Sequence, residues 1–159
     1  MKRLFFPVFL SSMLIMTGCP GRHRFYDWGM ANNSNYDIFV FYDLYLAKHP
    51  YPDTLFSFDH TYINIVNAYS SKRDMDHYPL DVIISRMPSD TLSFFFFHAD
   101  TVKKYSLEML QRDYKILVRY DLSSEDIRRL KNNYGIPEIP YPPDERMKNM
   151  KMYPPYGSK

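Results

Sequence analysis

Histidine and acidic side chains are the groups in this chain best suited to metal or acid–base chemistry. His98 and Asp100 are two positions apart, so on a strand they share a face and can orient each other or share a metal. Zinc sites usually need three or four converging ligands. The sequence has neither an HExxH motif nor a close pair of histidines. It therefore predicts no metal site and indicates no other cofactor.

Hydrolytic chemistry needs a nucleophile with a base, or two positioned carboxylates. The chain contains many serines and aspartates but no GxSxG motif. The spacing of Ser123 and Asp126 is typical of a helix cap and is fully explained by that role. We therefore assign no catalytic residue, and a hydrolase with an unrecognised site is the last of three hypotheses for function.

Cys19 is the only cysteine, and the segment before it has the three parts of a secretory signal. These parts are a basic start at residues 2–3, a hydrophobic run at residues 4–16, and small residues at 17–18. The run is shorter than the roughly 20 apolar residues that a membrane-spanning helix needs. The sequence therefore predicts that residues 1–18 are a signal peptide.

The residues Met16-Thr17-Gly18-Cys19 resemble the lipobox of bacterial lipoproteins, with methionine where leucine is usual. This resemblance implies that the mature chain begins at Cys19 and that a lipid is attached there. Two or more acyl chains hold a protein stably, at about 0.8 kcal/mol for each buried methylene. Membrane lipid, bound through acylated Cys19, is therefore the first predicted partner. The alternative is that Cys19 is a small buried hydrophobic residue.

Charge and composition narrow the other partners. The chain has 20 Lys and Arg against 18 Asp and Glu, and the predicted leader holds the two extra basic residues. The mature chain thus lacks the basic surplus that nucleic-acid binding requires, and nucleic acid is excluded. Aromatic residues make up 18% of the chain. They favour strands, or else a surface that binds an envelope protein or a glycan.

Hydrophobic patterns predict mostly strands. The clearest pair is 92–98, which contains four consecutive phenylalanines, and 114–122, which alternates. In 114–122 the face with Arg119 and Asp121 is expected to face water. Further strands are expected at residues 25–30, 36–42, 55–58, 62–66 and 80–84, with the charged stretch 70–77 as a separator.

Two short helices are expected in the C-terminal half. One covers 106–112, with Ser106 as its cap. The other begins at Ser123, buries Ile127, Leu130 and Tyr134 on one face, and stops at Gly135.

The sequence therefore predicts a strand-rich α+β fold, an antiparallel sandwich-like sheet core with two short helices in the C-terminal half. Residues 19–24 form a lipidated stem, and residues 25–159 form a single domain that includes a Pro- and Tyr-rich tail. The apolar residues of the tail, 137–159, favour packing against the domain, and the other reading is a free segment that binds a partner.

Segments 94–100, 117–126, 141–143 and 151–156 resemble a family of small lipoproteins from gut Bacteroides-type bacteria that has no characterised function. The resemblance covers most of the mature chain. It implies residence at an outer membrane and supplies no catalytic residue. Surface lipoproteins of such bacteria often have acidic residues after the lipidated cysteine. Residues 20–24 have none, which favours the periplasmic face over surface exposure.

Three hypotheses for function follow. The leading one is a membrane-anchored envelope lipoprotein that acts as a structural or protein-interaction module. The second is a glycan-binding lipoprotein, for which the candidate ligand-contact aromatics are Trp28, Tyr51 and Tyr78. The third is the hydrolase.

Overall fold

The computed structural model describes residues 25–42 and 62–158, so Cys19, Tyr51 and the expected strand at 55–58 lie outside the described residues. The described chain forms eight strands, four α-helices and one 3₁₀ helix. The strands are β1 (Tyr26–Asn32), β2 (Ile38–Tyr42), β3 (Tyr62–Val66), β4 (Ser70–Asp76), β5 (Thr91–His98), β6 (Val118–Ser123), β7 (Glu138–Tyr141) and β8 (Lys151–Tyr153). The helices are α1 (Leu80–Ser85), α2 (Ala99–Lys104), α3 (Leu107–Arg112), α4 (Ser124–Arg129) and the 3₁₀ helix η1 (Glu145–Met147). Within these ranges no helix has the length and apolar character needed to cross a bilayer.

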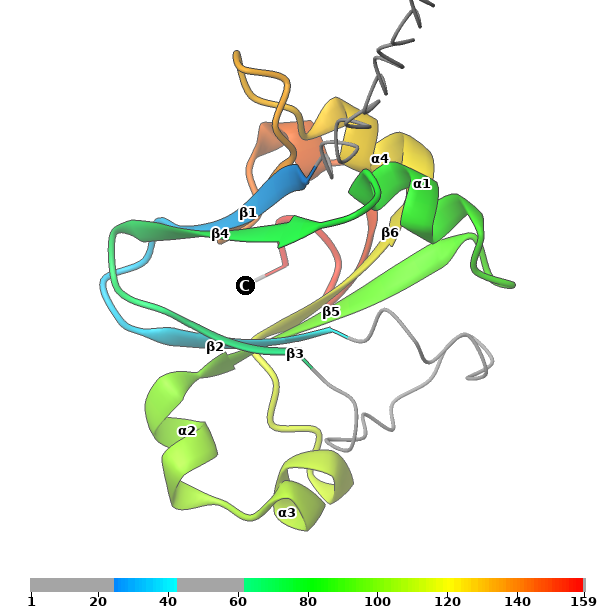
Figure 1. Ribbon diagram of the computed structural model, residues 1–159. Coiled ribbons are helices and arrows are strands. Elements are labelled where there is room, and N and C mark those ends of the chain that lie inside the picture. Colours follow the sequence, from blue (N-terminus) through cyan, green and yellow to red (C-terminus); the bar gives the residue numbers. More distant parts are fainter. Residues whose placement is uncertain (1–24, 43–61, 159) are drawn as a thin grey trace, which may run out of the picture.

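The strands form two sheets that face each other (Figure 1). The smaller sheet has the order β4-β1-β7, with β1 antiparallel to β4 and parallel to β7. The larger sheet has the order β3-β2-β5-β6-β8 and is antiparallel throughout. The predicted strand-rich α+β class with a sandwich-like core is confirmed. The described chain has four α-helices where two were expected, and all four lie in the C-terminal half.

The main core lies between the two sheets. Trp28 of β1 projects inward, with its ring centroid 5.0 Å from that of Tyr42 and 5.9 Å from that of Phe94. Phe96 of β5 stacks on Tyr141 at 5.5 Å. All five side chains are buried, and burying a large side chain contributes about 1.5–3 kcal/mol. This layer therefore helps to hold the two sheets together.

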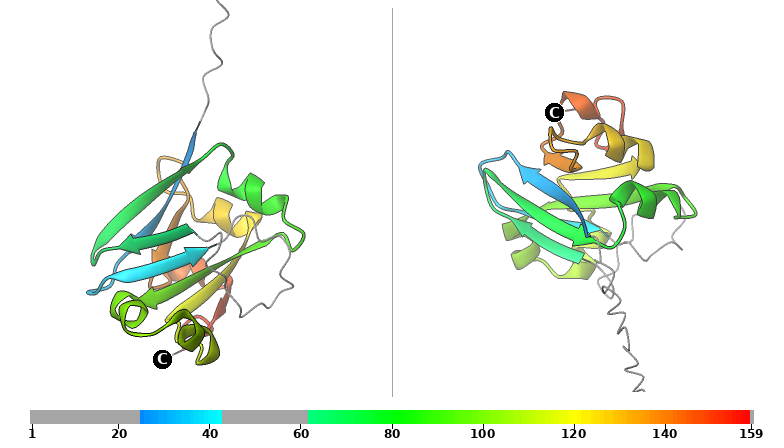
Figure 2. Two further views of the ribbon diagram at one scale, coloured as in Figure 1. Left: turned by 60° about the horizontal axis from the view of Figure 1, so that its bottom comes forward. Right: turned by 45° about the horizontal axis from the view of Figure 1, so that its top comes forward.

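A second core lies on the opposite face of the larger sheet, under α2 and α3 (Figures 1 and 2). The four consecutive phenylalanines of β5 supply both cores because alternate residues of a strand point to opposite faces. Phe94 and Phe96 face the smaller sheet, whereas Phe95 and Phe97 pack with Leu110 of α3. The prediction that this strand is covered on both sides is confirmed.

Residues 80–84 and the stretch 70–77 differ in secondary structure from the sequence prediction. Residues 80–84, expected as a strand, form helix α1, whose Leu80 and Ile84 are 2% and 0% exposed. Packing against α4 overrides the strand preference of the β-branched residues there. The charged stretch 70–77, expected as a separator, contains β4. Among the described strands this edge strand pairs with β1 alone, and most of its side chains are in solvent, so it needs no apolar alternation.

Helix α4 begins as predicted and ends earlier. The Ser123 amide donates to Asp126 Oδ2 at 2.9 Å and the Asp126 amide donates to Ser123 Oγ at 3.2 Å, a reciprocal cap. The helix stops at Arg129 rather than at Gly135. Tyr134, expected on the buried face, is 85% exposed because it lies in the turn beyond the helix. For α3, the predicted cap by Ser106 is confirmed.

The C-terminal tail packs against the domain. Its strand β7 pairs with β1, and its strand β8 pairs with β6. Ile139 and Met147 are fully buried, and Met150 is nearly so. The prediction of a packed tail is confirmed, and the tail completes both sheets.

Candidate functional site

Of the three aromatic residues predicted to contact a ligand, one is buried, one is exposed and one lies outside the described residues. Trp28 is 1% exposed. Its predicted ligand role is wrong because it lies on the inward face of β1, between the sheets. Tyr51 and the lipid attachment residue Cys19 lie outside the described residues. Tyr78 is 51% exposed, and the guanidinium of Arg86 lies 4.7 Å from its ring centroid. The structure therefore leaves Tyr78 as an accessible aromatic residue.

The pair His98 and Asp100 has a structural role. His98 ends β5, and its Nδ1 accepts a hydrogen bond of 3.2 Å from the backbone amide of Asp100, which caps α2. The His98 ring also stacks on Tyr36, with centroids 4.6 Å apart. Among the residues that the structure describes, no group of three or more His, Cys, Asp or Glu is placed to hold a metal ion.

Arg119 and Asp121 form a buried ion pair, which corrects the expectation that their face of β6 is wet. Arg119 Nε donates to Asp121 Oδ2 at 3.1 Å, and the side chains are 7% and 1% exposed. Ser93 Oγ donates to Asp121 Oδ1 at 2.6 Å, and Arg119 Nη1 donates to the Tyr114 hydroxyl at 3.1 Å. Burial raises the pKa of Tyr114. The rings of Tyr114 and Tyr153, on β8, meet at 5.5 Å. These groups satisfy one another and hold β5, β6 and β8 together.

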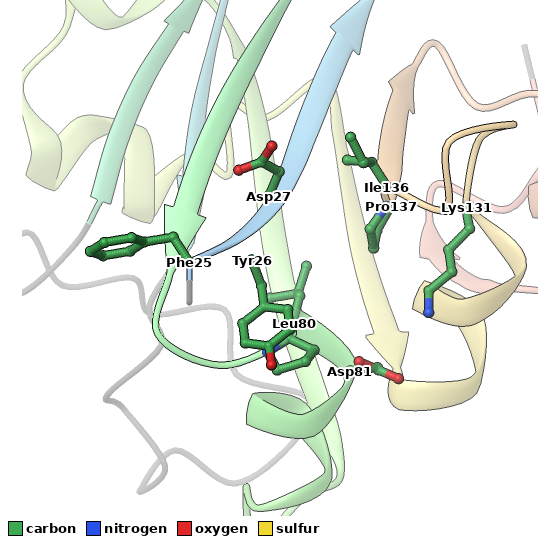
Figure 3. A pocket seen from close by; sticks show the side chains of 10 residues that line it. Phe25, Tyr26, Asp27, Leu80, Asp81, Lys131, Ile136 and Pro137 are labelled. Atoms are coloured by element: carbon green, nitrogen blue, oxygen red, sulfur yellow. The ribbon is translucent and has the colours of Figure 1, made fainter. Parts of the chain in front are cut away.

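A cleft of about 320 Å³ opens at the end of the smaller sheet where β1 begins. Figure 3 shows its walls. Tyr26 and Asp27 come from β1, and Leu80 comes from the start of α1. Ile136 faces them from the segment before β7. The other lining residues are Phe25, Pro79, Asp81, Lys131, Gly135 and Pro137. The size is at the small end of ligand pockets, which run from about 300 to 1,000 Å³.

The wall opposite β1 is a rigid turn. The side-chain oxygen of Asn132 accepts from the amides of Tyr134 and Ile136, at 3.0 and 3.1 Å. Gly135 closes the turn with its amide on the Asn132 carbonyl at 2.8 Å, and its φ of 75° suits glycine. The backbone amide of Glu138 then donates to the Leu130 carbonyl at 3.0 Å. The cleft wall is therefore preformed rather than dependent on a ligand.

The charged side chains that line the cleft differ in whether they have an ion-pair partner. Asp81 accepts from Arg128 Nε at 3.0 Å, and this hydrogen bond is the main cause of the raised pKa of Arg128. Asp27 lies 4.0 Å from the guanidinium of Arg73. Lys131 has no ion-pair partner within the described ranges, and its side chain extends along the wall towards Asp81 (Figure 3). Lys131 is therefore the charged residue of the cleft that has no ion-pair partner within these ranges.

The cleft combines an apolar centre with polar groups at its edges. Tyr26 offers a ring and a hydroxyl, Lys131 offers an ammonium, and Leu80, Ile136 and Pro137 offer apolar surface. The part of its lining that belongs to the described residues contains no serine, cysteine or histidine. The arrangement suits binding by shape and charge.

Sequence reasoning missed this cleft. Its walls come from β1, α1, the end of α4 and the turn before β7, and no local motif links these segments. Asp81 in particular lies in the segment 80–84, which the sequence predicts to be a strand. Comparison of the chain with protein-family models, with curated proteins and with solved structures gives no match.

Proposed function

We propose that this protein is a lipid-anchored envelope lipoprotein that acts as a protein-interaction module, with the cleft as its binding site. The observation that carries the binding role is the preformed cleft, in which the Lys131 ammonium has no ion-pair partner within the described residues. Ligand sites are typically concave and mostly apolar, with a few polar or charged groups that fix the orientation of the ligand.

The ligand that fits best is an extended segment of another envelope protein. An apolar side chain of that segment would occupy the space between Leu80 and Ile136. A carboxylate beside it would pair with Lys131, because opposite charges fix the register of a bound segment. The Tyr26 ring, 38% exposed, would cover the bound chain from the β1 side, as tyrosines commonly do at interfaces.

Anchoring is proposed from the sequence around Cys19 and from the resemblance to small lipoproteins of gut Bacteroides-type bacteria. We place the domain on the outer membrane, at the periplasmic face. The test is fractionation with fatty-acid labelling of the wild type and of Cys19→Ser. The wild type should take up label and sediment with membranes, and Cys19→Ser should do neither. A variant that stays on the membrane after an alkaline wash would refute the anchor.

The binding role is tested with a photocrosslinking amino acid placed in intact cells. Position 26 lies in the cleft, and position 65, where Ile65 is 48% exposed on β3 of the other sheet, is the control. A discrete adduct should form from position 26 and not from position 65. Lys131→Glu should abolish the adduct by reversing the available charge. Equal adducts from both positions, or an adduct that Lys131→Glu leaves unchanged, would refute the cleft as the site.

A glycan is the second candidate ligand, and one observation favours it. The half-exposed Tyr26 ring beside Asp27 gives the stacking surface and hydroxyl acceptor that sugar rings use. Envelope oligosaccharides added to the crosslinking reaction should compete with the adduct if the glycan reading holds. If they have no effect while the adduct forms, the ligand is a protein segment.

A further inference from the structure

A group of apolar side chains is exposed at the same end of the domain as the cleft. Phe25, Met75 and Tyr78 are 55%, 64% and 51% exposed. Met75 is paired across the strands with Asp27, and the Phe25 ring lies 4.9 Å from that of His77. We call Phe25, Met75, His77 and Tyr78 the entry patch, because the chain enters the described domain there.

The entry patch lies on the outer face of the smaller sheet. Phe25 and Asp27 of the β1 segment share one face because they are two positions apart, and the inward face carries Trp28. In Figure 3 the ring of Phe25 points away from the side chains of Tyr26 and Leu80. More than half of the surface of Phe25 and of Met75 is exposed. The patch therefore presents apolar side chains to the surroundings of the domain.

The occupant of this surface follows from the length of chain between Cys19 and Phe25. Six peptide links separate the two residues, and a fully extended chain spans at most about 3.3–3.6 Å per residue. Phe25 therefore lies within about 20 Å of the lipidated cysteine that the proposed function requires. The entry patch is therefore within reach of the lipid headgroups.

The chemistry of the patch suits the headgroup region. Aromatic rings with a polar edge, such as Tyr78, are enriched where membrane meets water. The Arg86 guanidinium over the Tyr78 ring supplies a cation for anionic headgroups. Scattered single hydrophobic residues are ordinary on protein surfaces, but here Phe25 directly precedes β1, Met75 lies on the neighbouring strand β4, and both are exposed at the end where the chain enters the described domain.

We propose that the entry patch rests in the headgroup layer of the membrane that carries the lipid anchor, an inference that depends on the proposed lipidation of Cys19. The lipid then holds the domain near the bilayer, and the patch fixes its orientation. The cleft, lined by Phe25 and Tyr26 at the same end, opens beside the membrane surface. Helices α2 and α3, on the far side of the larger sheet (Figures 1 and 2), point away from it.

The experiment uses the full mature lipoprotein in vesicles of phosphatidylethanolamine and phosphatidylglycerol. In the lipidated protein Cys19 is blocked as a thioether, so an introduced cysteine is the single reactive thiol. Met75→Cys probes the patch. Met109→Cys is the matched control, because Met109 is also an exposed methionine but lies on α3. Each variant carries an environment-sensitive fluorophore, and part of the lipid carries a nitroxide on its headgroup.

The label at position 75 should shift to the blue on reconstitution and be quenched several-fold more than the label at position 109. Replacing Phe25 and Tyr78 together by serine should reduce that difference, with circular dichroism showing that the double variant is folded. Equal quenching at positions 75 and 109, or none at either, would overturn the proposal. So would a position 75 label that is free in lipid vesicles and buried only in native membranes, since a protein would then cover the patch.

Failure of the anchor would look different from failure of the patch. If Cys19 is not lipidated, the wild-type protein reacts with the fluorophore and does not float with the vesicles, and the proposed function is wrong at its first step. If the protein floats and Cys19 is unreactive, but the label at position 75 is not quenched, only the orientation is refuted.

Discussion

Replacing Asp121 by asparagine tests whether the buried ion pair is as important to stability as its geometry implies. The substitution keeps the shape and an oxygen that can accept from Ser93. It replaces the oxygen that faces Arg119 Nε at 3.1 Å by a neutral amide NH2, so the charge and that acceptor are both lost. The guanidinium then stays in a site where the side chain is 7% exposed without its carboxylate.

The expected loss of stability follows from that burial. Breaking a buried ion pair by removing one partner costs about 3–5 kcal/mol, because the remaining charge keeps its desolvation cost. For a domain of this size each kcal/mol lowers the Tm by roughly 3–5 °C, so Asp121→Asn should melt about 10–20 °C below the wild type.

The matched control is Asp113→Asn. Asp113 also pairs with an arginine, at 2.7 Å from Arg112 Nε, but the two side chains are 70% and 31% exposed for Arg112 and Asp113. Exposed pairs contribute little, so this variant should melt like the wild type. Thermal unfolding followed by circular dichroism, with urea unfolding as a second measure, compares the two.

A double variant distinguishes the effect of the two charges from the effect of side-chain volume. Arg119→Met with Asp121→Leu replaces both charges by apolar groups, which is often neutral or stabilising at buried sites. It should recover most of the lost Tm. If Asp121→Asn and Asp113→Asn have the same Tm, the claim that this pair stabilises the sheet is refuted.

Three further predictions follow from the cores and the tail. Phe96→Ala should cost about 3–5 kcal/mol, because its fully buried ring packs on Tyr120 and on Tyr141; a urea midpoint equal to that of the wild type would contradict the assigned packing. Deleting residues 152–159 should lower the Tm by several degrees, since a loss of about 1–2 kcal/mol is expected when β8 no longer pairs with β6, and a tail whose amides exchange as fast as a free peptide would argue against that pairing. Burial raises the pKa of Tyr120 and of Tyr141, so the folded state keeps protons that the unfolded chain loses above about pH 10, and stability should be full below that pH and fall above it. Tyr120→Phe should flatten this alkaline fall in urea titrations at stepwise pH, and an unchanged slope would exclude Tyr120 as a cause.

The elements that could be predicted from the sequence are those with a local physical signal. The spacing of Ser123 and Asp126 predicts a reciprocal cap, and helix α4 begins at that cap. The four phenylalanines of β5 require cover on both faces, and the structure supplies it from the smaller sheet on one side and from α2 and α3 on the other.

The elements that could not be predicted depend on distant partners. Leu80 and Ile84 belong to a run with strand preference, and only α4, more than 40 positions later in the chain, makes the helix favourable there. The charges of Arg119 and Asp121 suggest that both residues face solvent. In the structure the two charges neutralise each other, and residues distant in the sequence bury the pair. The cleft has no sequence signature for the same reason, since Tyr26 and Lys131 meet only through the fold.

The position of β1 also has a mechanical consequence. The chain reaches the domain at Phe25, so traction on an N-terminal anchor pulls β1 along its own length. Backbone hydrogen bonds lie across the strand direction, and β1 is bonded to β4 on one side and to β7 on the other. Such a strand is loaded in shear, where its hydrogen bonds share the force instead of opening one after another. Because β7 comes from the C-terminal tail, the strand that would bear the load is held on one side by a segment more than 100 positions away in the sequence.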